Sequence, residues 1–556
     1  MDKKIELANL IFPNVTKTID DLEKEYPERE LGEGRRVTRF APSPTGFLHT
    51  GSLFTSLVAY KTAKDSGGIF YTRLEDTDSK REVEGSDKLL LRQLHEFGID
   101  PDEGYFGDHE EGIYGPYVQS KRKEIYETVI KEMISKGDAY PCFMTETELN
   151  ELREEQSKNK EITGVYGKYA KYRDLSAADA IEYIKEGKPF VIRFKSNGNH
   201  LNKIKCHDEI RGDLELTQND QDIVICKSDG LPTYHFAHIC DDHFMHTTHV
   251  TRGEEWLPSL PIHLELFKRL GFKTPKYAHL PVIMKMDNGT RRKLSKRKDP
   301  EASVDYFLKE GYEPQALLVY LMTIANSNYE DFIVQSKDYD VSHFILSFKK
   351  MSLDGALFDN DKLNYYSKEV LGKMNKDEIS KKAYEWSKQY SPELKDFIEK
   401  DYNKFVLIMN IEREKKNPRK DYAKFSDIYP MIKFFDRDVF SSLINETLDF
   451  NEKLDKDLII NFLKEYKTSG YSLENDENTW FNNVKVVANK FNFCLDNKLY
   501  KADPTKWVGN VNDACEIIRV VLTLRRVTPN LFAIMQIMGK DEIDYRIDSI
   551  ITQLSK

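Results

Sequence analysis

The feature that most constrains the fold of this chain is a change of pattern partway along it. Up to about residue 290, short β-rich runs are mixed with helical stretches, whereas beyond about residue 340 the apolar residues recur at helical spacing. At 556 residues the chain is also too long for a single hydrophobic core. The sequence therefore predicts several domains, with an α/β first part and an all-helical second part.

Individual elements can be assigned within this pattern. The predicted strands are 36–40, 69–74, 189–194, 222–227 and 248–253. The predicted helices of the first part are 52–65 and 118–136. In the second part, 455–466 and 514–526 carry apolar residues at helical spacing, and no internal repeat is evident. The first 34 residues are polar and charged, and their sequence suggests no function.

Composition excludes several classes of protein. Hydrophobic residues make up 40% and charged residues 32%, as in soluble globular proteins. The longest apolar run, 316–325, is shorter than the roughly 18 residues that a membrane span needs. The N-terminus lacks the pattern of a signal peptide, and six scattered cysteines form no disulfide framework. We expect a cytoplasmic protein with no membrane partner.

The segment "RFAPSPTGFLHTGS" (39–52) joins the first predicted strand to the first predicted helix. Such a strand–loop–helix unit directs helical N–H groups and the positive end of the helix dipole at whatever lies above the loop, which suits phosphate. It matches neither a Walker loop nor GxGxxG, so a rigid proline-rich turn is the alternative. Gly51 follows His49 by two residues, so a base or ribose could pack on bare backbone while the imidazole reaches a phosphate oxygen.

Two further segments favour a nucleotide site. The strand 69–74 ends in "EDTD" (75–78), as the second strand of a nucleotide-binding fold often ends in an acid. The tract "RRKLSKRK" (291–298) holds six basic residues in eight, although the net charge of the chain is −10. A solvated loop or a targeting signal is the alternative explanation of this tract.

Together these segments resemble the glutamyl-tRNA synthetases, a family of class I aminoacyl-tRNA synthetases. The resemblance rests on "RFAPSPTG", "RLEDTD", "SDGLPTYHFA", "DDH", "RGEEW" and "KLSKR", which occur in this order between residue 36 and about residue 300. The glutaminyl relatives typically carry Glu-Pro-Asn where this chain has Ser43-Pro44-Thr45. The resemblance implies an α/β fold: a class I, Rossmann-like nucleotide-binding domain with an inserted acceptor-end domain, followed by the helical anticodon-binding half of the bacterial form.

The domain boundaries implied by the resemblance follow the change of pattern. They are an N-terminal extension of unknown role (1–34), a catalytic domain in two pieces (35–115 and 240–290), an inserted acceptor-end-binding domain (116–239), a linking domain with the lysine loop (291–345) and helical anticodon-binding domains (346–556).

The resemblance also implies the reaction, which is the ATP-dependent joining of L-glutamate to tRNA-Glu through a glutamyl-adenylate. Mg²⁺ is expected to arrive with ATP, and the enzyme is expected to be a monomer. Charging of tRNA-Gln, glutamylation of a different acceptor and an inactive RNA-binding paralogue are the alternatives. Enzymes that glutamylate a different acceptor typically lack an anticodon-binding half, and about 210 residues of helical pattern argue against that alternative. An inactive paralogue is disfavoured by four intact motif residues, His49, Glu75, Lys293 and Lys296.

Site residues follow from the positions that match the family motifs. The implied glutamate-binding residues are Arg39, Ala41, Ser43, Glu75, Tyr234 and Arg252. The implied ATP-binding residues are His49, Gly51, Ser52, Glu255, Trp256, Lys293, Ser295 and Lys296. His49 and Lys296 are the catalytic candidates, because adenylate formation needs positive charge around the α-phosphate rather than a general base. Glu75 suits the ammonium group and the two arginines suit the carboxylates, although which arginine takes which carboxylate stays open.

Three segments are potential decoys. "KKMSLD" (349–354) resembles a fragment of the lysine-loop motif but lacks the second lysine, so we expect a structural role. "HICDDHFMHTTH" (238–249) has many potential metal ligands at spacings that match no standard zinc site. Within it, His238 is expected near the glutamate pocket or the tRNA end. Cys142 is followed by Met144 where some relatives have a second cysteine, so we expect no structural zinc.

Overall fold

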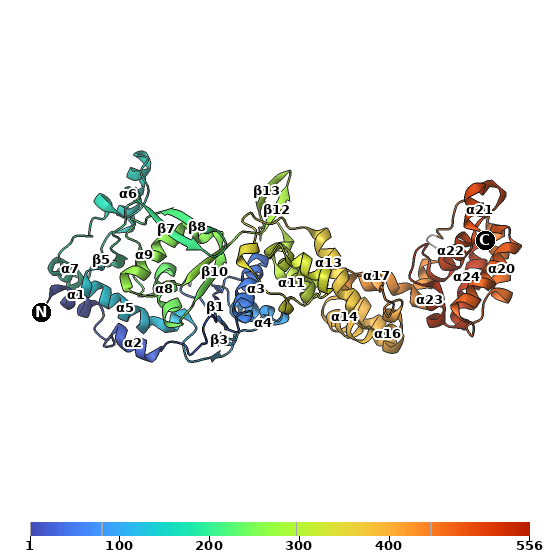
Figure 1. Ribbon diagram of the computed structural model, residues 1–556, viewed down its shortest axis with the longest axis horizontal. Helices are drawn as coiled ribbons and strands as arrows, with labels where there is room; N and C mark the ends of the chain where they lie inside the picture. The colour runs from blue at the N-terminus through green and yellow to red at the C-terminus, as the bar shows by residue number, and fades with distance from the viewer. Residues whose placement is uncertain (1, 79–81, 296, 445–447) are drawn as a thin grey trace. The chain divides into compact units, whose positions relative to one another are not determined.

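The structure is a computed structural model that describes residues 2–78, 82–295, 297–444 and 448–556. The chain divides into two compact units: Met1–Phe307 with Leu317–Asp359, and Leu308–Ala316 with Asn360–Lys556. The first unit mixes strands and helices, and the second is almost entirely helical (Figure 1). In the described ranges, no helix is both long enough and apolar enough to cross a membrane.

The centre of the first unit is built from parallel strands linked by helices. Strands β1 (Val37–Phe40), β2 (Ile69–Thr72) and β3 (Glu103–Tyr105) pair in parallel, and β4 (Glu110–Glu111) adds an antiparallel edge. The helices that follow β1 and β2 are α3 (Thr50–Lys64) and α4 (Ser86–Glu96). All four residues of β1 are buried, as expected for a strand covered on both faces. This β–α–β–α–β order gives the Rossmann-like arrangement predicted from the sequence.

A second pair of parallel strands lies beside β1. Strand β10 (His249–Gly253) is followed by α9 (Leu260–Leu270) and then by β11 (Lys276–Leu280), which pairs with β10 in parallel. The amide N–H of Thr248 donates to the Val37 carbonyl at 3.0 Å, which joins the two groups of strands. Because β1, β2 and β10 run in the same direction, the residues at their carboxyl ends meet at one edge.

The segment between β4 and β10 adds an antiparallel sheet, a hairpin and four helices. The sheet consists of β5 (Ala139–Cys142), β6 (Val191–Phe194) and β9 (Val224–Cys226). The helices are α5 (Lys123–Lys136), α6 (Glu146–Lys158), α7 (Ala177–Lys185) and α8 (Tyr234–Phe244). The hairpin is β7 (Lys203–Asp208) and β8 (Gly212–Thr217), which adds to the β10–β11 pair on its β11 side (Figure 1). Its residue Asp208 pairs with Tyr277 of β11, which brings a carboxylate from this segment to the catalytic sheet.

The first 34 residues are part of the core of the first unit. They form α1 (Lys3–Ile11) and α2 (Ile19–Glu25), which pack on α5, and Leu7 and Leu22 are buried in the same apolar cluster as α8. Arg29 forms an ion pair with Glu103, and Nε2 of His243 lies 2.6 Å from the Glu23 carboxylate. The N-terminal segment therefore holds the carboxyl end of α8, a role that its polar composition did not suggest.

The chain after the lysine loop is mostly helical. Helix α12 (Tyr329–Ser336) belongs to the first unit, whereas α10 (Val304–Glu310) and α11 (Pro314–Ala325) contribute residues to both. The helices of the second unit are α13 (Asn360–Lys373), α14 (Lys376–Tyr390), α15 (Pro392–Lys400), α16 (Tyr402–Asn410), α17 (Ile428–Ile432), α18 (Arg437–Leu443), α19 (Lys456–Glu465), α20 (Glu477–Lys490), α21 (Asn497–Ala502), α22 (Val511–Thr523), α23 (Leu531–Met538) and α24 (Lys540–Leu554). The second unit also has two short parallel strands that the helical pattern did not predict, β14 (Phe493–Cys494) and β15 (Gly509–Asn510).

The predicted elements are confirmed, with differences at their ends. The five predicted strands correspond to β1, β2, β6, β9 and β10, and the predicted helices of the first part to α3 and α5. Helix α19 covers most of 455–466. Helix α22 begins earlier than predicted because Asn510 caps it in a reciprocal capping box with Asp513. It ends at Thr523, because the next residue, Leu524, has a left-handed φ of 57°. The capping residues of α22 therefore determine where the helix begins and ends, which the spacing of its apolar residues did not define.

Candidate active site

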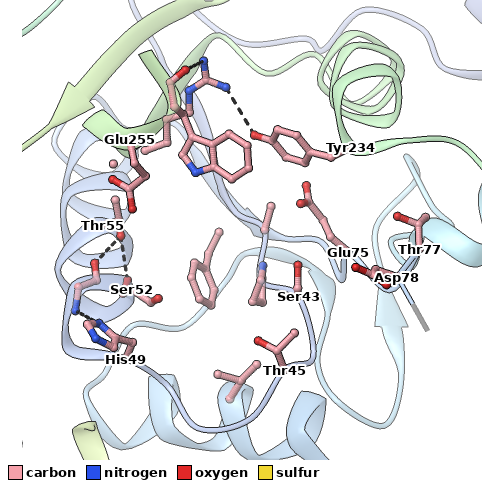
Figure 2. A pocket seen from close by; sticks show the side chains of 18 of the residues that line it. Ser43, Thr45, His49, Ser52, Thr55, Glu75, Thr77, Asp78, Tyr234 and Glu255 are labelled. Atoms are coloured by element: carbon pink, nitrogen blue, oxygen red, sulfur yellow. Dashed lines mark hydrogen bonds between the residues drawn. The ribbon is translucent and has the colours of Figure 1, made fainter. Parts of the chain in front are cut away.

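A cavity of about 1150 Å³ opens in the first unit at the carboxyl ends of β1, β2 and β10 (Figure 2). The predicted site residues that line it are Arg39, Ala41, Ser43, His49, Gly51, Ser52, Glu75, Tyr234, Arg252, Glu255, Trp256 and Lys293. Ser295 does not line it, and Lys296 lies outside the described residues. The topology thus brings together residues that are up to 254 positions apart in the chain.

His49 occupies the N-terminus of α3, as the strand–loop–helix pattern predicted. Its Nδ1 accepts a hydrogen bond from the Gly51 amide at 2.9 Å, so the proton of the neutral ring lies on Nε2. A Cβ at residue 51 would approach Nδ1 to 3.1 Å, which explains the glycine there. The Thr50 hydroxyl donates to the Glu301 carbonyl at 2.6 Å, and this bond ties the turn to the chain that follows the lysine loop. The imidazole is thereby presented as a hydrogen-bond donor at a helix N-terminus.

Glu75 follows β2 and directs its carboxylate into the cavity toward Tyr234 (Figure 2). One carboxylate oxygen, Oε1, accepts from Arg73 Nη2 at 3.0 Å, and Oε2 has no partner among the described residues. Burial raises the pKa of Glu75 and outweighs the opposing effect of the Arg73 charge. The cavity therefore presents one partly compensated carboxylate at this position.

Arg39 enters the cavity from the end of β1. Its Nε donates to Asp242 Oδ1 at 3.1 Å, while its terminal nitrogens have no partner in the described part of the chain. Asp242 also accepts from Arg73 Nη1 at 2.8 Å. Burial by itself would raise the pKa of Asp242, but the charges of Arg39 and Arg73 outweigh it and hold this pKa well below its usual value. Asp242 thus holds Arg39, a residue that lines the cavity, through its Nε.

The apparent metal-ligand cluster in 238–249 has a different role. Asp241 accepts from Arg122 Nε at 2.6 Å and from Gln119 Nε2 at 2.8 Å, while Asp242 binds the arginines described above. No three His, Cys, Asp or Glu side chains are placed to hold a metal ion, within the residues that the structure describes. Two adjacent aspartates on a largely buried helix require buried cationic partners, and this signal could have identified their role from the sequence.

His238 lies one layer behind the cavity. Its ring stacks on Tyr234 at 5.8 Å between centroids, and its Nε2 lies 3.0 Å from the Tyr277 hydroxyl. Burial lowers the pKa of His238 to about 3, so the ring is neutral. His238 is not among the residues that line the cavity, which places it behind Tyr234 rather than against a ligand.

Arg252, at the end of β10, is 6% exposed and is held by two histidines. Its Nε donates to His279 Nε2 at 2.9 Å, and its Nη1 donates to His263 Nδ1 at 3.1 Å. Nη1 also lies 3.5 Å from the Tyr234 hydroxyl, the contact drawn in Figure 2. No carboxylate of the described ranges forms an ion pair with Arg252. His263 and His279 were not identified from the sequence, because neither belongs to a motif.

A second end of the cavity is lined by Lys293, the last residue of the hairpin of β12 (Met284–Asp287) and β13 (Thr290–Lys293). Lys293 Nζ lies 2.9 Å from Glu255 Oε1, and their side chains are 54% and 47% exposed. Trp256 packs on Tyr234 at 4.4 Å between ring centroids, which links this end to the first. The Ser295 amide donates to Asp299 Oδ2 at 2.8 Å, so Ser295 is held at the hairpin base rather than in the cavity.

"KKMSLD" lies outside the cavity. Lys349 and Lys350 are in a short 3-10 helix over Phe348–Lys350, and Met351 is buried. The Lys350 carbonyl accepts from the Ser327 amide at 2.9 Å. These contacts agree with the structural role predicted for this segment.

Comparison with known proteins identifies the family. Residues 36–365 match the family described as tRNA synthetases class I (E and Q), catalytic domain. A glutamate–tRNA ligase of Clostridium perfringens (strain 13 / Type A) is 45% identical over 97% of this chain and 99% of its own. One of Acetivibrio thermocellus is 42% identical over 99% of this chain and 100% of its own.

A solved structure agrees with these relatives. The crystal structure of a glutamate tRNA ligase from Elizabethkingia meningosepticum CCUG26117, in complex with its amino acid, has a TM-score of 0.73 and 28% identity. The match covers 94% of this chain and 100% of that one. The catalytic-domain family matches more than half of the chain, and the relatives are 42–45% identical over nearly all of it. The chain therefore belongs to the glutamate–tRNA ligase family of class I aminoacyl-tRNA synthetases.

Proposed function

We propose that this protein uses ATP to join L-glutamate to tRNA-Glu through a glutamyl-adenylate. The observation that carries the proposal is a cavity with two buried guanidinium groups, those of Arg39 and Arg252, and the carboxylate of Glu75, whose side chain is 10% exposed. Glutamate has two carboxylates and one ammonium group, which are opposite in sign to these two guanidinium groups and this carboxylate. The membership of the family and the names of its relatives support the same substrate.

Discrimination against glutamine follows from the same groups. Arg252 has no protein counter-ion among the described residues, and a neutral amide would leave its charge uncompensated. A buried site that pairs charge in this way can reject the wrong ligand by roughly 10⁴-fold. Ala41 and Ser43 lie on the loop that follows β1, the strand that carries Arg39, and complete the proposed glutamate pocket.

In the first chemical step, a carboxylate oxygen of glutamate attacks the α-phosphorus of ATP. A C–O–P bond forms, the bond to the β-phosphate oxygen breaks, and pyrophosphate leaves. The attacking group is already ionised, so the protein has only to position it and stabilise the negative charge. We assign this role to the Nε2–H of His49 and to Lys296, which lies outside the described residues. Lys296→Ala is expected to remove most adenylate formation while leaving glutamate binding nearly intact.

ATP is proposed to occupy the end of the cavity lined by Gly51, Ser52, Glu255, Trp256 and Lys293, as its Mg²⁺ complex. Ser295 would act only by holding the lysine loop, because it does not line the cavity. In the second step, a hydroxyl of the terminal adenosine of tRNA attacks the acyl carbon and AMP leaves. This step requires the tRNA end to reach the same cavity.

For the rest of the chain, we propose that 35–115 and 240–290 bind the two small substrates and that 116–239 binds the acceptor end. Residues 291–345 would link to the tRNA stem, and 346–556 would bind the anticodon. The scaffolding role of α1 and α2 accounts for 1–34. We also propose a cytoplasmic monomer that acts on tRNA.

The test is charging by the purified full-length chain of tRNA-Glu and tRNA-Gln, in parallel and with glutamate. The proposal expects glutamyl-tRNA-Glu, and glutamate-dependent exchange of pyrophosphate into ATP when tRNA is present. Charging of both tRNAs would extend the proposal to a non-discriminating enzyme. Absence of both charging and exchange would contradict it and favour a binding protein without activity.

A further inference from the structure

Arg252 belongs to a chain of hydrogen bonds in which the position of each proton is fixed. The chain runs from Asp208 through His279 to Arg252, and from Arg252 through His263 to His235. Its members come from β7, β11, β10, α9 and α8, which the fold brings together at one edge of the cavity. The proposed chemistry uses neither Asp208 nor the three histidines, and of these four residues only His235 lies in a sequence motif, "SDGLPTYHFA".

On one side of Arg252 the order of donors starts at Asp208. This carboxylate is an acceptor, because its Oδ1 receives the amides of Ile210 and Arg211 at 3.0 and 2.9 Å. His279 Nδ1, 2.6 Å from Oδ2, must therefore donate. Its Nε2 is left with a lone pair, and this atom accepts from Arg252 Nε at 2.9 Å.

On the other side the order starts at Arg252, since a guanidinium can only donate. Its Nη1 donates to His263 Nδ1 at 3.1 Å, so the His263 proton lies on Nε2. That Nε2 donates in turn to His235 Nδ1 at 3.1 Å. A second proton on His263 or His279 would put two donors face to face, so both rings are neutral.

The surroundings agree with neutral rings. Burial lowers the pKa of His263 well below its ordinary value, and the nearby His238 and Arg252 lower it further. Burial likewise lowers the pKa of His279. The other polar groups that face Arg252 are the hydroxyl of Tyr234 and the carbonyl of Trp256, and its guanidinium lies 4.8 Å from the Tyr277 ring. In the described chain, every direct partner of Arg252 is thus an uncharged group.

We propose that His263, His279 and Asp208 are positioning residues that hold Arg252 as a buried cation without a protein counter-ion, so that the carboxylate of bound glutamate supplies it. The inference rests on the proposed function and concerns how its substrate is recognised. Arg39 offers the contrast inside the same cavity, because Asp242 already compensates it. A buried charge without a partner raises the free energy of the empty site. The carboxylate of glutamate lowers this free energy by pairing with the charge, whereas the neutral amide of glutamine does not.

The test uses a matched pair, His263→Gln and His263→Glu. The two side chains have the same length and both offer an oxygen acceptor to Arg252, but only Glu brings a negative charge. Dissociation constants for glutamate and for ATP are measured by titration calorimetry on the full chain, with thermal unfolding as the check on folding. We expect the Glu variant to bind glutamate roughly 10- to 100-fold more weakly than the Gln variant, with equal ATP affinity. Equal glutamate affinity of the two folded variants overturns the proposal.

A second pair covers the case in which His263→Glu does not fold. His279→Gln keeps an acceptor for Arg252, whereas His279→Leu removes it. We expect His279→Leu to raise KM for glutamate by roughly 10-fold or more over His279→Gln, with kcat at saturating glutamate changed much less. A fall in kcat with no change in KM contradicts a positioning role. A wild-type chain that binds no glutamate would instead refute the proposed function itself, so the two failures are distinguishable.

Discussion

The two ends of the active-site cavity are built on different physical principles. At the proposed glutamate end, Arg39 and Arg252 are each 6% exposed, and buried side chains fix both before any ligand arrives. At the proposed nucleotide end, Lys293 and Glu255 are 54% and 47% exposed and contact each other through an ion pair. The first end is pre-organised, and the second has to rearrange its charges when phosphate binds.

This difference matches what each ligand demands. Discrimination of glutamate from glutamine depends on one charge, so the guanidinium groups have to be desolvated and held in place. Triphosphate carries a large charge that a mobile ammonium group can follow, and an exposed lysine suits this task. Substitutions at the two ends should therefore affect different substrates and differ in size.

The largest effect is expected from Arg252→Met, which removes the charge but keeps much of the side-chain volume. Loss of one partner of a buried ion pair costs about 3–5 kcal/mol, so KM for glutamate should rise by roughly 10²–10⁴-fold. KM for ATP should change by no more than a few-fold. Steady-state charging kinetics measure both constants, and parallel increases in the two would remove the distinction between the ends.

Asp242→Asn tests whether the glutamate end depends on its buried scaffold. Arg39 and Arg73 would lose a counter-ion, and the free energy of unfolding should fall by about 3 kcal/mol. Urea denaturation measures this fall, and Asp213→Asn, at an exposed position on β8, is the matched control. A loss no larger than that of the control would show that Asp242 does not organise this end.

The same variant makes a prediction about pH. The pKa of Asp242 in the folded chain is well below its ordinary value of 3.8, so its stabilising effect is complete above about pH 4 and is lost as the pH falls further. The wild type should therefore lose stability between about pH 4 and pH 2 more steeply than Asp242→Asn. Chemical denaturation across this range measures both slopes, and equal slopes would contradict the assignment.

Lys293→Met should weaken ATP binding and leave glutamate binding unchanged, the reverse of what is expected for Arg252→Met. Removal of a partly exposed phosphate contact costs about 1.5 kcal/mol, so KM for ATP should rise roughly tenfold while the dissociation constant for glutamate stays the same. Pyrophosphate exchange gives the first quantity and calorimetry the second. A glutamate defect in this variant would mean that the two ends are coupled.

The smallest effect is expected from Glu255→Gln. The Lys293–Glu255 pair is half-exposed, and such pairs contribute about 0.2–1 kcal/mol, less at high salt. KM for ATP should shift by less than about fivefold, and by less again at 0.5 M salt than at 0.05 M salt. A large, salt-independent change would show that the nucleotide end is as pre-organised as the glutamate end.

Sequence motifs located the residues that face the cavity better than the residues behind them. Arg39 and Glu75 could be placed because each belongs to a family motif, "RFAPSPTG" or "RLEDTD", at the end of a predicted strand. Asp242 was harder to interpret, because a run of His, Cys and Asp looks like a metal site until its arginine partners, 169 and 203 positions away, are known. Long-range pairing of this kind leaves no periodic signal in a single sequence.

The same limit applies to other parts of the site. His279 and Asp208 meet only because β7 pairs with β11, and the hairpin that carries Asp208 gives no indication of its partner in the sequence. Ser295 matches the lysine-loop motif, yet Asp299 holds its backbone away from the cavity. A motif therefore identified the loop, while local hydrogen bonds determined which of its residues line the site.

Charging of tRNA-Glu with glutamate or glutamine by the purified chain tests the central claim most directly. The buried guanidinium of Arg252, which has no carboxylate partner in the described chain, predicts a kcat/KM for glutamate roughly 10⁴-fold above that for glutamine. Comparable charging with the two amino acids would contradict the assignment of Arg39 and Arg252 to substrate carboxylates and, with it, the proposed function.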